Sequence, residues 1–241
     1  MKKTFAIGDI HGGFRALTQL IDKLDLGADD TLIFLGDYVD GWSEPVETLD
    51  FLLQLELEYN CIFIKGNHDA WCEDWLKTGE LNELWFHHGG QATFDAYSAQ
   101  PANIKKYHLG FLERMLPYHV QHDCLFIHAG YTSMHGPEKE NYTANYRWDR
   151  TLWEMAVCMD SRIQKDEVSF PKRLKLFKEI FIGHTPTLNY NVTVPMQACN
   201  VWNIDTGAAF TGKLSAINVD TKEVFQSDVV QSLYPNEKGR N

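Results

Sequence analysis

The sequence predicts a single α/β domain over residues 1–241, with parallel strands at its core. The chain is 44% hydrophobic and 23% charged, which is the composition of an ordinary globular protein. Its length is enough for one sizeable hydrophobic core. Short apolar runs are mostly continuous rather than alternating, as expected for strands buried on both faces. The first three runs are separated by helical patterns, and this order implies a βαβαβ unit.

The expected strands are short and recur along the whole chain, at residues 4–7, 31–35, 61–64, 124–127, 179–182, 201–204 and 214–219. Apolar residues at helical spacing predict helices from Phe14 to Leu24 and from Val46 to Leu53, and Pro45 suits the first turn of the second. Further helices are expected within 70–117, including an amphipathic segment at 109–116, and near 151–159. Residues 236–241 are expected to form a polar tail.

Composition excludes several classes of protein. The net charge is −11 and lysines and arginines form no cluster, so we expect no nucleic-acid partner. No run approaches the roughly 20 apolar residues of a membrane-spanning helix, so no membrane association is expected. The five cysteines are odd in number and form no CxxC pair. Free thiols in a reducing compartment, and hence a cytoplasmic location, are the expectation.

Polar residues suited to metal binding follow five of the expected strands. The first three strands lead into Gly-Asp-Ile-His-Gly at 8–12, Gly-Asp-Tyr-Val-Asp-Gly at 36–41 and Gly-Asn-His-Asp at 66–69, and two later strands end at His128 and His184. Parallel strands bring their carboxyl ends to one edge of a sheet, where open α/β sheets place their sites. A single such motif is usually a turn, and a single histidine is usually structural. Five together predict a site.

The donor set indicates the chemistry. Carboxylate, carboxamide and imidazole groups suit divalent Mn, Fe or Zn. There are more of these groups than one tetrahedral ion needs, and the surplus suits two neighbouring ions sharing a carboxylate. A pair of ions roughly 3.5–4 Å apart can clamp a phosphoryl group during in-line displacement. The sequence therefore predicts a site for two divalent metals and phosphoester hydrolysis.

These motifs resemble the calcineurin-like metallophosphoesterase superfamily over roughly residues 4–210. Within it, Gly-Asp-x-Val-Asp and the Asn-His after glycine are similar to the bacterial phosphoprotein phosphatases, a branch that also contains the symmetrical diadenosine tetraphosphate hydrolases. The segment from Trp85 through Gly89 and Gly90 to Thr93 is similar to one in bacterial members. The resemblance implies the metallophosphatase fold, with two packed mixed β-sheets flanked by helices.

The resemblance also implies a role for each matching residue. Asp9 and His11 would hold one metal; being two apart, their side chains would share one side of an extended chain. Asp37 would bridge both ions. The second ion would be completed by three further residues, namely Asn67, His128 and His184. His68, paired with Asp40, would be the general acid, and a metal-bridging hydroxide would be the nucleophile. Manganese is the expected metal, with iron or zinc as alternatives.

Two departures from the family pattern concern substrate phosphate. Gly41 stands where phosphoprotein phosphatases usually have an arginine, and Lys65 replaces a second one. Lysine supplies charge without a bidentate fork. The remaining candidates are Arg150 and, after it, Arg147; for both, a surface salt bridge is the alternative interpretation. Trp42 either lines the substrate cleft or is a partly buried loop residue.

The leading prediction is a protein serine/threonine phosphatase that acts on a phosphorylated protein or peptide. The alternatives in the same class are a symmetrical diadenosine tetraphosphate hydrolase and a small-molecule phosphatase acting on a small phosphoester. An alternative from another class is a non-catalytic binding module with the same fold. The acidic surface favours a phosphopeptide over a polyphosphate. Asp69 and Asp205 are expected to support turns, and the other six histidines to be structural or exposed.

Overall fold

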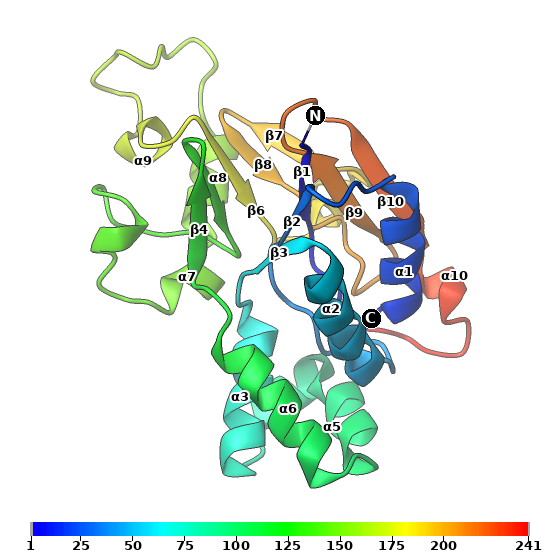
Figure 1. Ribbon diagram of the computed structural model, residues 1–241. Helices are drawn as coiled ribbons and strands as arrows, with labels where there is room; N and C mark the ends of the chain where they lie inside the picture. Colours follow the sequence, from blue (N-terminus) through cyan, green and yellow to red (C-terminus); the bar gives the residue numbers. More distant parts are fainter. Residues whose placement is uncertain (1, 241) are drawn as a thin grey trace.

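The computed structural model describes residues 2–240, which form two mixed five-stranded sheets flanked by helices (Figure 1). The first sheet has the strand order β10–β9–β1–β2–β3, and the second β4–β5–β6–β8–β7. The strands of the first sheet are β1 (Thr4–Ile7), β2 (Thr31–Phe34), β3 (Asn60–Phe63), β9 (Lys213–Asn218) and β10 (Val224–Val229). Those of the second are β4 (Tyr118–Gln121), β5 (Cys124–Ile127), β6 (Glu179–Ile182), β7 (Met196–Ala198) and β8 (Val201–Asn203).

The strand register brings the site-bearing loops to one level. Strands β1, β2 and β3 are parallel, with Ile7 opposite Phe34 and Phe34 opposite Phe63. In the second sheet β5, β6 and β8 are parallel. The loops that follow β1, β2 and β3 therefore begin side by side. The βαβαβ unit and the fold of two mixed sheets are confirmed.

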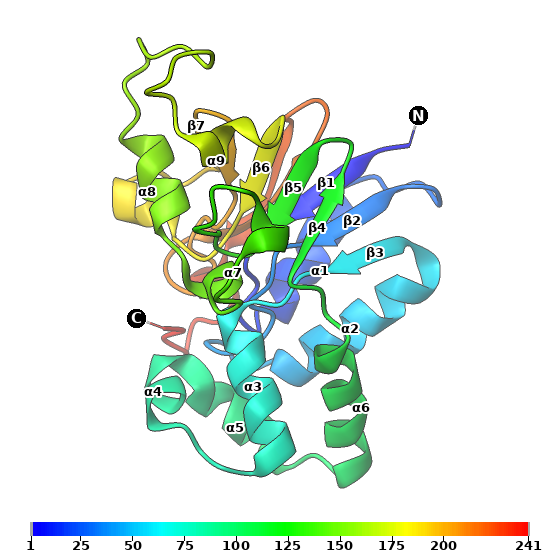
Figure 2. The ribbon, with the colours of Figure 1, turned by 90° about the vertical axis from the view of Figure 1, so that its left-hand side faces the viewer.

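The helices cover the outer faces and one end of the molecule. Their bounds are α1 (Phe14–Lys23), α2 (Pro45–Glu58), α3 (Asn67–Thr78), α4 (Glu83–Trp85), α5 (Gln91–Ser98), α6 (Ala102–Glu113), α7 (Asn145–Trp148), α8 (Thr151–Val157), α9 (Lys172–Lys175) and α10 (Val230–Leu233). Helix α1 packs on β9 and β10, and α8 packs on β7 and β8. Helices α3 to α6 form a helical group below the sheets in both views (Figures 1 and 2).

The core between the two sheets is apolar and tightly packed. Ala6 and Ile33 from the first sheet meet Phe126 and Phe181 from the second, and the two phenylalanine rings stack with centroids 5.0 Å apart. A second cluster buries the apolar faces of α1 and α2 against the first sheet. All five cysteines are free thiols. Among residues 2–240, no helix has the length and apolar character that crossing a membrane requires.

The expected elements are present with small shifts in their ends, and three strands were not expected. These three, β4, β7 and β10, are short or partly polar, and each lies at the outer edge of a sheet, where a strand needs no continuous apolar run. The helix expected at 109–116 is the end of α6, which stops at Glu113. Beyond it, Leu116 pairs with Ile64 beside β3 instead of continuing the helix.

Candidate metal centre

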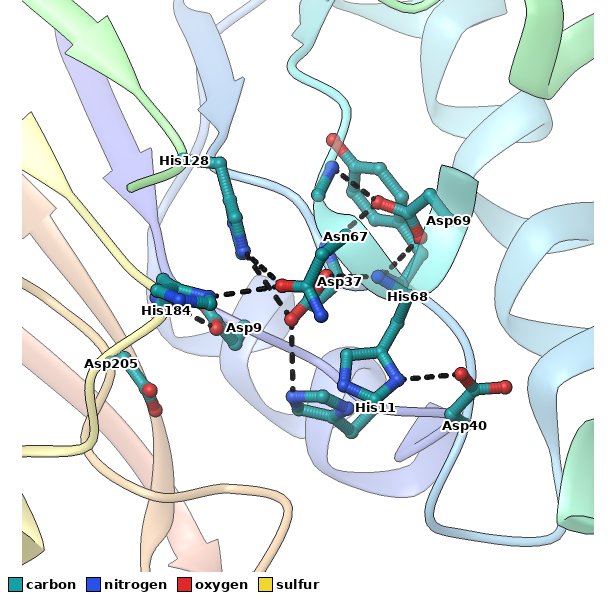
Figure 3. Close-up of polar contacts among 12 residues, drawn as sticks. Asp9, His11, Asp37, Asp40, Asn67, His68, Asp69, His128, His184 and Asp205 are labelled. Carbon is teal, nitrogen blue, oxygen red and sulfur yellow. Dashed lines mark hydrogen bonds and ion pairs between the residues drawn. The ribbon is translucent and has the colours of Figure 1, made fainter. Parts of the chain in front are cut away.

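Ten polar side chains meet where the strands of both sheets end (Figure 3). All are buried even though every one is titratable or strongly polar, and they are Asp9, His11, Asp37, Asp40, Asn67, His68, Asp69, His128, His184 and Asp205. Seven of them lie in the loops after β1, β2, β5, β6 and β8, and Asn67, His68 and Asp69 form the first turn of α3, which follows β3. The edge of the sheets predicted from the five motifs is therefore where these residues converge.

Asp37 lies at the centre of the group. Its Oδ2 atom is 3.7 Å from Nε2 of His11 and 3.4 Å from Nε2 of His128, so one oxygen stands between imidazoles from two different sheets. Its Oδ1 atom accepts a hydrogen bond of 2.9 Å from the backbone N–H of His68. Two sets of ligand-type atoms that lie within 4.8 Å of one another share it: His11, Asp37 and His68 form one set, and Asp37, His128 and His184 form the other.

Asn67 contacts both histidines of the second set. Its Oδ1 atom lies 3.1 Å from Nε2 of His128 and 2.9 Å from Nδ1 of His184. The other ring nitrogen of His128, Nδ1, is 2.8 Å from the carbonyl oxygen of Leu35. Because a carbonyl can only accept, Nδ1 carries the proton, and Nε2 is the nitrogen left to bind a cation.

Asp9 lies beside these groups but belongs to neither. Its Oδ2 atom accepts a 3.0 Å hydrogen bond from the backbone N–H of His184, and its Oδ1 atom is buried without a hydrogen-bond partner. The expectation of an extended chain between Asp9 and His11 was wrong. His11 has a φ of 55° and lies in a tight turn, where its N–H bonds to the carbonyl of Asp37 at 2.8 Å.

Burial and neighbouring charges shift the pKa values of the site residues. Burial alone would raise the pKa of Asp37, but His128, His68 and His11 outweigh it and hold that pKa well below its usual range. Burial lowers the pKa of His11 and of His184, assisted by nearby positive charges. Burial alone would lower the pKa of His128, but Asp37 and Asp9 outweigh it and raise that pKa to about 9. Asp37 is therefore an anion beside a protonated His128, and binding a cation there would displace the proton of that imidazole.

Several donor atoms of the site lack a partner. Oδ1 of Asp9, Nδ1 of His11 and Nε2 of His184 are buried without a hydrogen bond within residues 2–240. Such atoms are costly in a protein interior unless a ligand satisfies them. With the two groups around Asp37, they fit two divalent cations. These ions would polarise a phosphoryl oxygen and lower the pKa of bound water.

Two glycines make room for the carboxylates. A Cβ atom at Gly66 would lie 2.1 Å from Oδ1 of Asp37, and one at Gly183 would lie 2.0 Å from Oδ1 of Asp9. No real Cβ contact is that short, so any larger residue would displace a carboxylate. Gly66 and Gly183 are thus required by carboxylates that follow other strands, and not only by their own turns.

His68 is held by a completely satisfied carboxylate. Its Nδ1 atom is 2.6 Å from Oδ2 of Asp40, which also accepts a 2.7 Å hydrogen bond from the indole N–H of Trp85. The other oxygen of Asp40 accepts from the hydroxyl of Thr93 at 2.6 Å. Asp40 keeps the proton on Nδ1, and the rings of His68 and His11 meet edge to face with centroids 5.0 Å apart. The Trp85–Thr93 segment therefore orients the pair.

Asp69 and Asp205 support turns, as expected. Asp69 accepts hydrogen bonds of 2.8 Å from the backbone N–H groups of Asp37, Tyr38 and Gly66, which ties the loops after β2 and β3 together. Asp205 accepts one of 2.9 Å from the N–H of Gly207. Burial, with Asp37 nearby, raises the pKa of Asp69 to about 7.

A cavity of about 410 Å³ lies next to the candidate metal ligands. Its lining includes His11 and His184, Asp205 and two arginines, Arg150 and Arg240. The structure thus brings Arg150 to the site, as predicted. Sequence reasoning missed Arg240, because it lies in the segment 236–241 that was expected to be a polar tail. The last residue of that segment, at position 241, lies outside the described residues.

The other candidates for phosphate binding lie elsewhere. Lys65 forms an ion pair with Glu73, and neither it nor Arg147 lines this cavity. The interpretation of Trp42 as a cleft residue was wrong. It is completely buried, stacks on Tyr234 with centroids 5.1 Å apart, and donates its indole N–H to the carbonyl of Ala208.

Two tryptophan side chains contact histidines of the site. Trp71, from α3, is edge-on to His68 with centroids 5.2 Å apart, and Trp148, from α7, lies 5.8 Å from His184. The two indoles meet at 5.0 Å, and Trp148 is 39% exposed. Of the histidines without an expected site role, His108 is structural, because its ring bonds to Tyr97 and Asp50.

The fold and this site define a metallophosphoesterase. A sequence profile of the calcineurin-like phosphoesterase family matches residues 2–209, and the chain belongs to that family. It is therefore a hydrolase of phosphoesters.

Individual relatives of the chain have more specific names. The chain is 26% identical to a symmetrical bis(5'-nucleosyl)-tetraphosphatase of Neisseria gonorrhoeae over 269 residues, covering 92% of this chain and 94% of that one. It is also 26% identical to an asymmetrical bis(5'-nucleosyl)-tetraphosphatase of Bacillus mycoides, with 88% of each chain covered. A protein serine/threonine phosphatase of Saccharomyces cerevisiae shares the fold at 15% identity, with a TM-score of 0.60 over 94% of this chain and 79% of that one.

Proposed function

We propose that this protein hydrolyses dinucleoside polyphosphates at a site for two divalent metals. The observation that carries the proposal is the pair of indoles, Trp71 and Trp148, that contacts the site histidines His68 and His184. A partly exposed indole beside a phosphate site offers a surface on which a nucleobase can stack. A phosphoserine or phosphothreonine peptide has no base to place there.

The comparisons support the same substrate. Relatives that match about nine-tenths of the chain are named as bis(5'-nucleosyl)-tetraphosphatases, whereas the serine/threonine phosphatase is similar in fold alone. The protein serine/threonine phosphatase, the leading prediction from sequence, therefore becomes the second candidate. Surface acidity also counts less against a polyphosphate, since Arg150 and Arg240 make the cavity wall locally cationic despite the net charge of −11.

Each side chain of the site would have a defined role in this reaction. Asp9, His11 and Asp37 would hold one ion, and Asp37 would share the other with three residues, Asn67, His128 and His184. Arg150 would bind the phosphate chain. His68, oriented by Asp40 through its 2.6 Å contact, would donate its proton to the phosphate oxygen that leaves as a nucleotide. Manganese remains the metal that we expect.

A substrate panel tests the proposal. The protein, stripped of metal and reloaded with Mn²⁺, is given diadenosine tetraphosphate, a phosphoserine peptide and inorganic tripolyphosphate, and the nucleotide products are separated by chromatography. We expect kcat/KM to be at least about tenfold higher for diadenosine tetraphosphate than for the peptide. A pair of ADP molecules as product indicates symmetrical cleavage, and ATP with AMP indicates asymmetrical cleavage. Faster release of phosphate from the peptide would overturn the proposal in favour of the protein phosphatase.

Replacing one indole of the pair tests directly whether a nucleobase stacks there. Trp148→Ala should raise KM for diadenosine tetraphosphate by about tenfold or more, because stacking of a base on an aromatic side chain contributes about 1–3 kcal/mol. It should leave KM for tripolyphosphate, which has no base, within about twofold. Tyr107→Ala, which removes an exposed aromatic ring from α6, is the matched control and should change neither constant. Equal effects on both substrates would contradict stacking.

A further inference from the structure

Gly41 stands where the family usually has an arginine, and another arginine side chain passes over it. Gly41 has a φ of 104°, and a Cβ atom there would lie 3.3 Å from Cγ of Arg240. The same is true of Gly89, whose φ is 105° and whose Cβ would lie 3.0 Å from that Cγ. The two glycines are joined by a 3.1 Å hydrogen bond from the N–H of Gly41 to the carbonyl of Gly89. Their bare backbone forms the floor under the aliphatic stem of Arg240.

The segment that carries Arg240 is held in place along its length. Glu237 accepts hydrogen bonds of 3.0 Å and 2.7 Å from the N–H and hydroxyl of Ser43, which follows Gly41 and Trp42 in the second motif. The N–H of Arg240 bonds to the carbonyl of Ala209 at 2.9 Å. Both views place this C-terminal segment at the level where the helical group meets the sheets (Figures 1 and 2). These contacts hold Arg240, which lines the cavity at the site, in a fixed place.

The side chain of Arg240 lies at the same cavity as the candidate metal ligands. It lines the cavity of about 410 Å³ together with His11, Arg150 and His184, and its carbon Cζ lies 5.4 Å from the ring centroid of Phe210. After burial, its positive charge is the largest influence lowering the pKa of His11. Within residues 2–240, neither Arg240 nor Arg150 forms an ion pair with a carboxylate. Two arginines without carboxylate partners on one wall are suited to an anion.

We propose that Arg240 is a substrate-binding residue that, together with Arg150, binds the phosphate groups of the substrate and takes the place of the arginine that Gly41 replaces. The proposal rests on the proposed function, since it assigns a phosphate chain to this cavity. A planar guanidinium can bind two phosphate oxygens at once, which Lys65, already paired with Glu73, cannot do. Gly41 and Gly89 are then specificity-determining positions, because their positive φ favours glycine and a Cβ atom at either would crowd the stem.

The test separates the charge of Arg240 from its packing. Arg240→Met keeps an unbranched stem over the two glycines and removes the guanidinium, while Arg240→Lys keeps the charge and removes the fork. Arg162→Met is the matched control, because that arginine is 88% exposed and pairs with Asp160 at the surface. Binding of inorganic phosphate to the Mn²⁺-loaded proteins is measured by calorimetry. Kinetics on diadenosine tetraphosphate are measured on the same preparations, and thermal unfolding checks the fold.

We expect Arg240→Met to weaken phosphate binding and to raise KM by about 10- to 100-fold, the range for losing a charged hydrogen-bonding partner. Arg240→Lys should recover part of both, and Arg162→Met should match the unmodified protein. Unchanged phosphate affinity and KM in Arg240→Met would overturn the proposal. If the unmodified protein cleaves no dinucleoside polyphosphate but its phosphate affinity still depends on Arg240, the proposed function fails and the assignment of Arg240 stands.

Discussion

The imidazole of His68 and the carboxylate of Asp40 lie 2.6 Å apart, and both side chains are buried. Trp85 and Thr93, from the helical group, donate to the same carboxylate at 2.7 Å and 2.6 Å. Asp40 therefore has no freedom to turn away, and His68 presents one fixed nitrogen to the site. Asp40 lies in the loop after β2 and His68 in the first turn of α3, and the groups that orient the pair come from residues 85–93. The position of the proposed proton donor therefore depends on the helical group.

Replacing His68 should have an effect that depends on the leaving group. His68→Asn removes the proton donor, and a positioned general acid contributes roughly 10²–10⁴ in rate. We expect a loss of about 100-fold or more on an alkyl phosphate, because an alkoxide leaves poorly without a proton. The loss on diadenosine tetraphosphate should be within about tenfold, since a phosphate with a pKa near 6 needs little protonation. Equal losses in kcat on both substrates would argue against His68 as the acid.

Asp37→Asn should remove metal without disturbing the fold. Asp37 has a φ of 54°, a conformation that asparagine tolerates well, and one of its oxygens lies between His11 and His128. The variant loses the anionic charge and one shared ligand, so metal content after reloading should fall from about two ions per chain toward one or fewer, and kcat should fall by roughly 100-fold or more. Elemental analysis and circular dichroism measure the metal content and the fold. Full metal content in the variant would contradict the bridging position.

Gly183→Ala should damage the site although it adds only a methyl group. The new carbon would stand 2.0 Å from Oδ1 of Asp9, so the carboxylate or the loop after β6 has to move. We expect loss of at least one bound ion and of about 1–3 kcal/mol of unfolding free energy, the usual cost of overpacking. Gly110→Ala, inside α6 with no atom within 4 Å, is the control. It should stabilise the protein by about 0.5–1 kcal/mol and leave metal content unchanged. Metal content that stays complete in Gly183→Ala would show that the loop yields easily.

Glu140 should stabilise the fold in a way that acid removes. Burial alone would raise its pKa, but hydrogen bonds from the backbone N–H groups of Thr132, Tyr142 and Ser133 outweigh it and lower the pKa to about 2, against an ordinary value of 4.5. A carboxylate with a lowered pKa stabilises the folded state fully above its unfolded pKa. That contribution is then lost as the pH falls from about 4.5 toward 2.

Glu140→Gln measures this contribution. At pH 7 the variant should be less stable by about 1 kcal/mol, a value reduced for solvent screening of a partly exposed group. At pH 3 the difference from the unmodified protein should be smaller, because Glu140 is then mostly protonated in the unfolded chain and has to lose that proton on folding. Urea unfolding at the two pH values gives both differences. A difference that grows in acid would contradict a lowered pKa for Glu140 in the folded state.

Most of the metal site could be predicted because its information is local. Each ligand follows a short apolar strand within a few residues, and parallel strands carry those positions to one edge whatever the rest of the fold does. Gly66 and Gly183 belong to these local motifs. The reason why each position needs glycine is visible only in the folded protein, where Gly66 lies against Asp37 and Gly183 against Asp9. Edge strands such as β10 were missed because partly polar segments lack the continuous pattern of a buried strand.

The sequence by itself therefore determined the fold class and the buried strands, and it indicated the residues that we propose bind two metals and donate a proton. The tertiary structure alone decided which cationic and aromatic groups surround them. Arg240 reaches Gly41 from the far end of the chain, and Trp71 meets Trp148 from a different helix, while Lys65 turns to Glu73. No local pattern marks such contacts, because they arise from packing between segments whose own periodicity is satisfied in many arrangements. The candidate metal ligands lie in local motifs, whereas the groups proposed to recognise the substrate come together only in the folded chain.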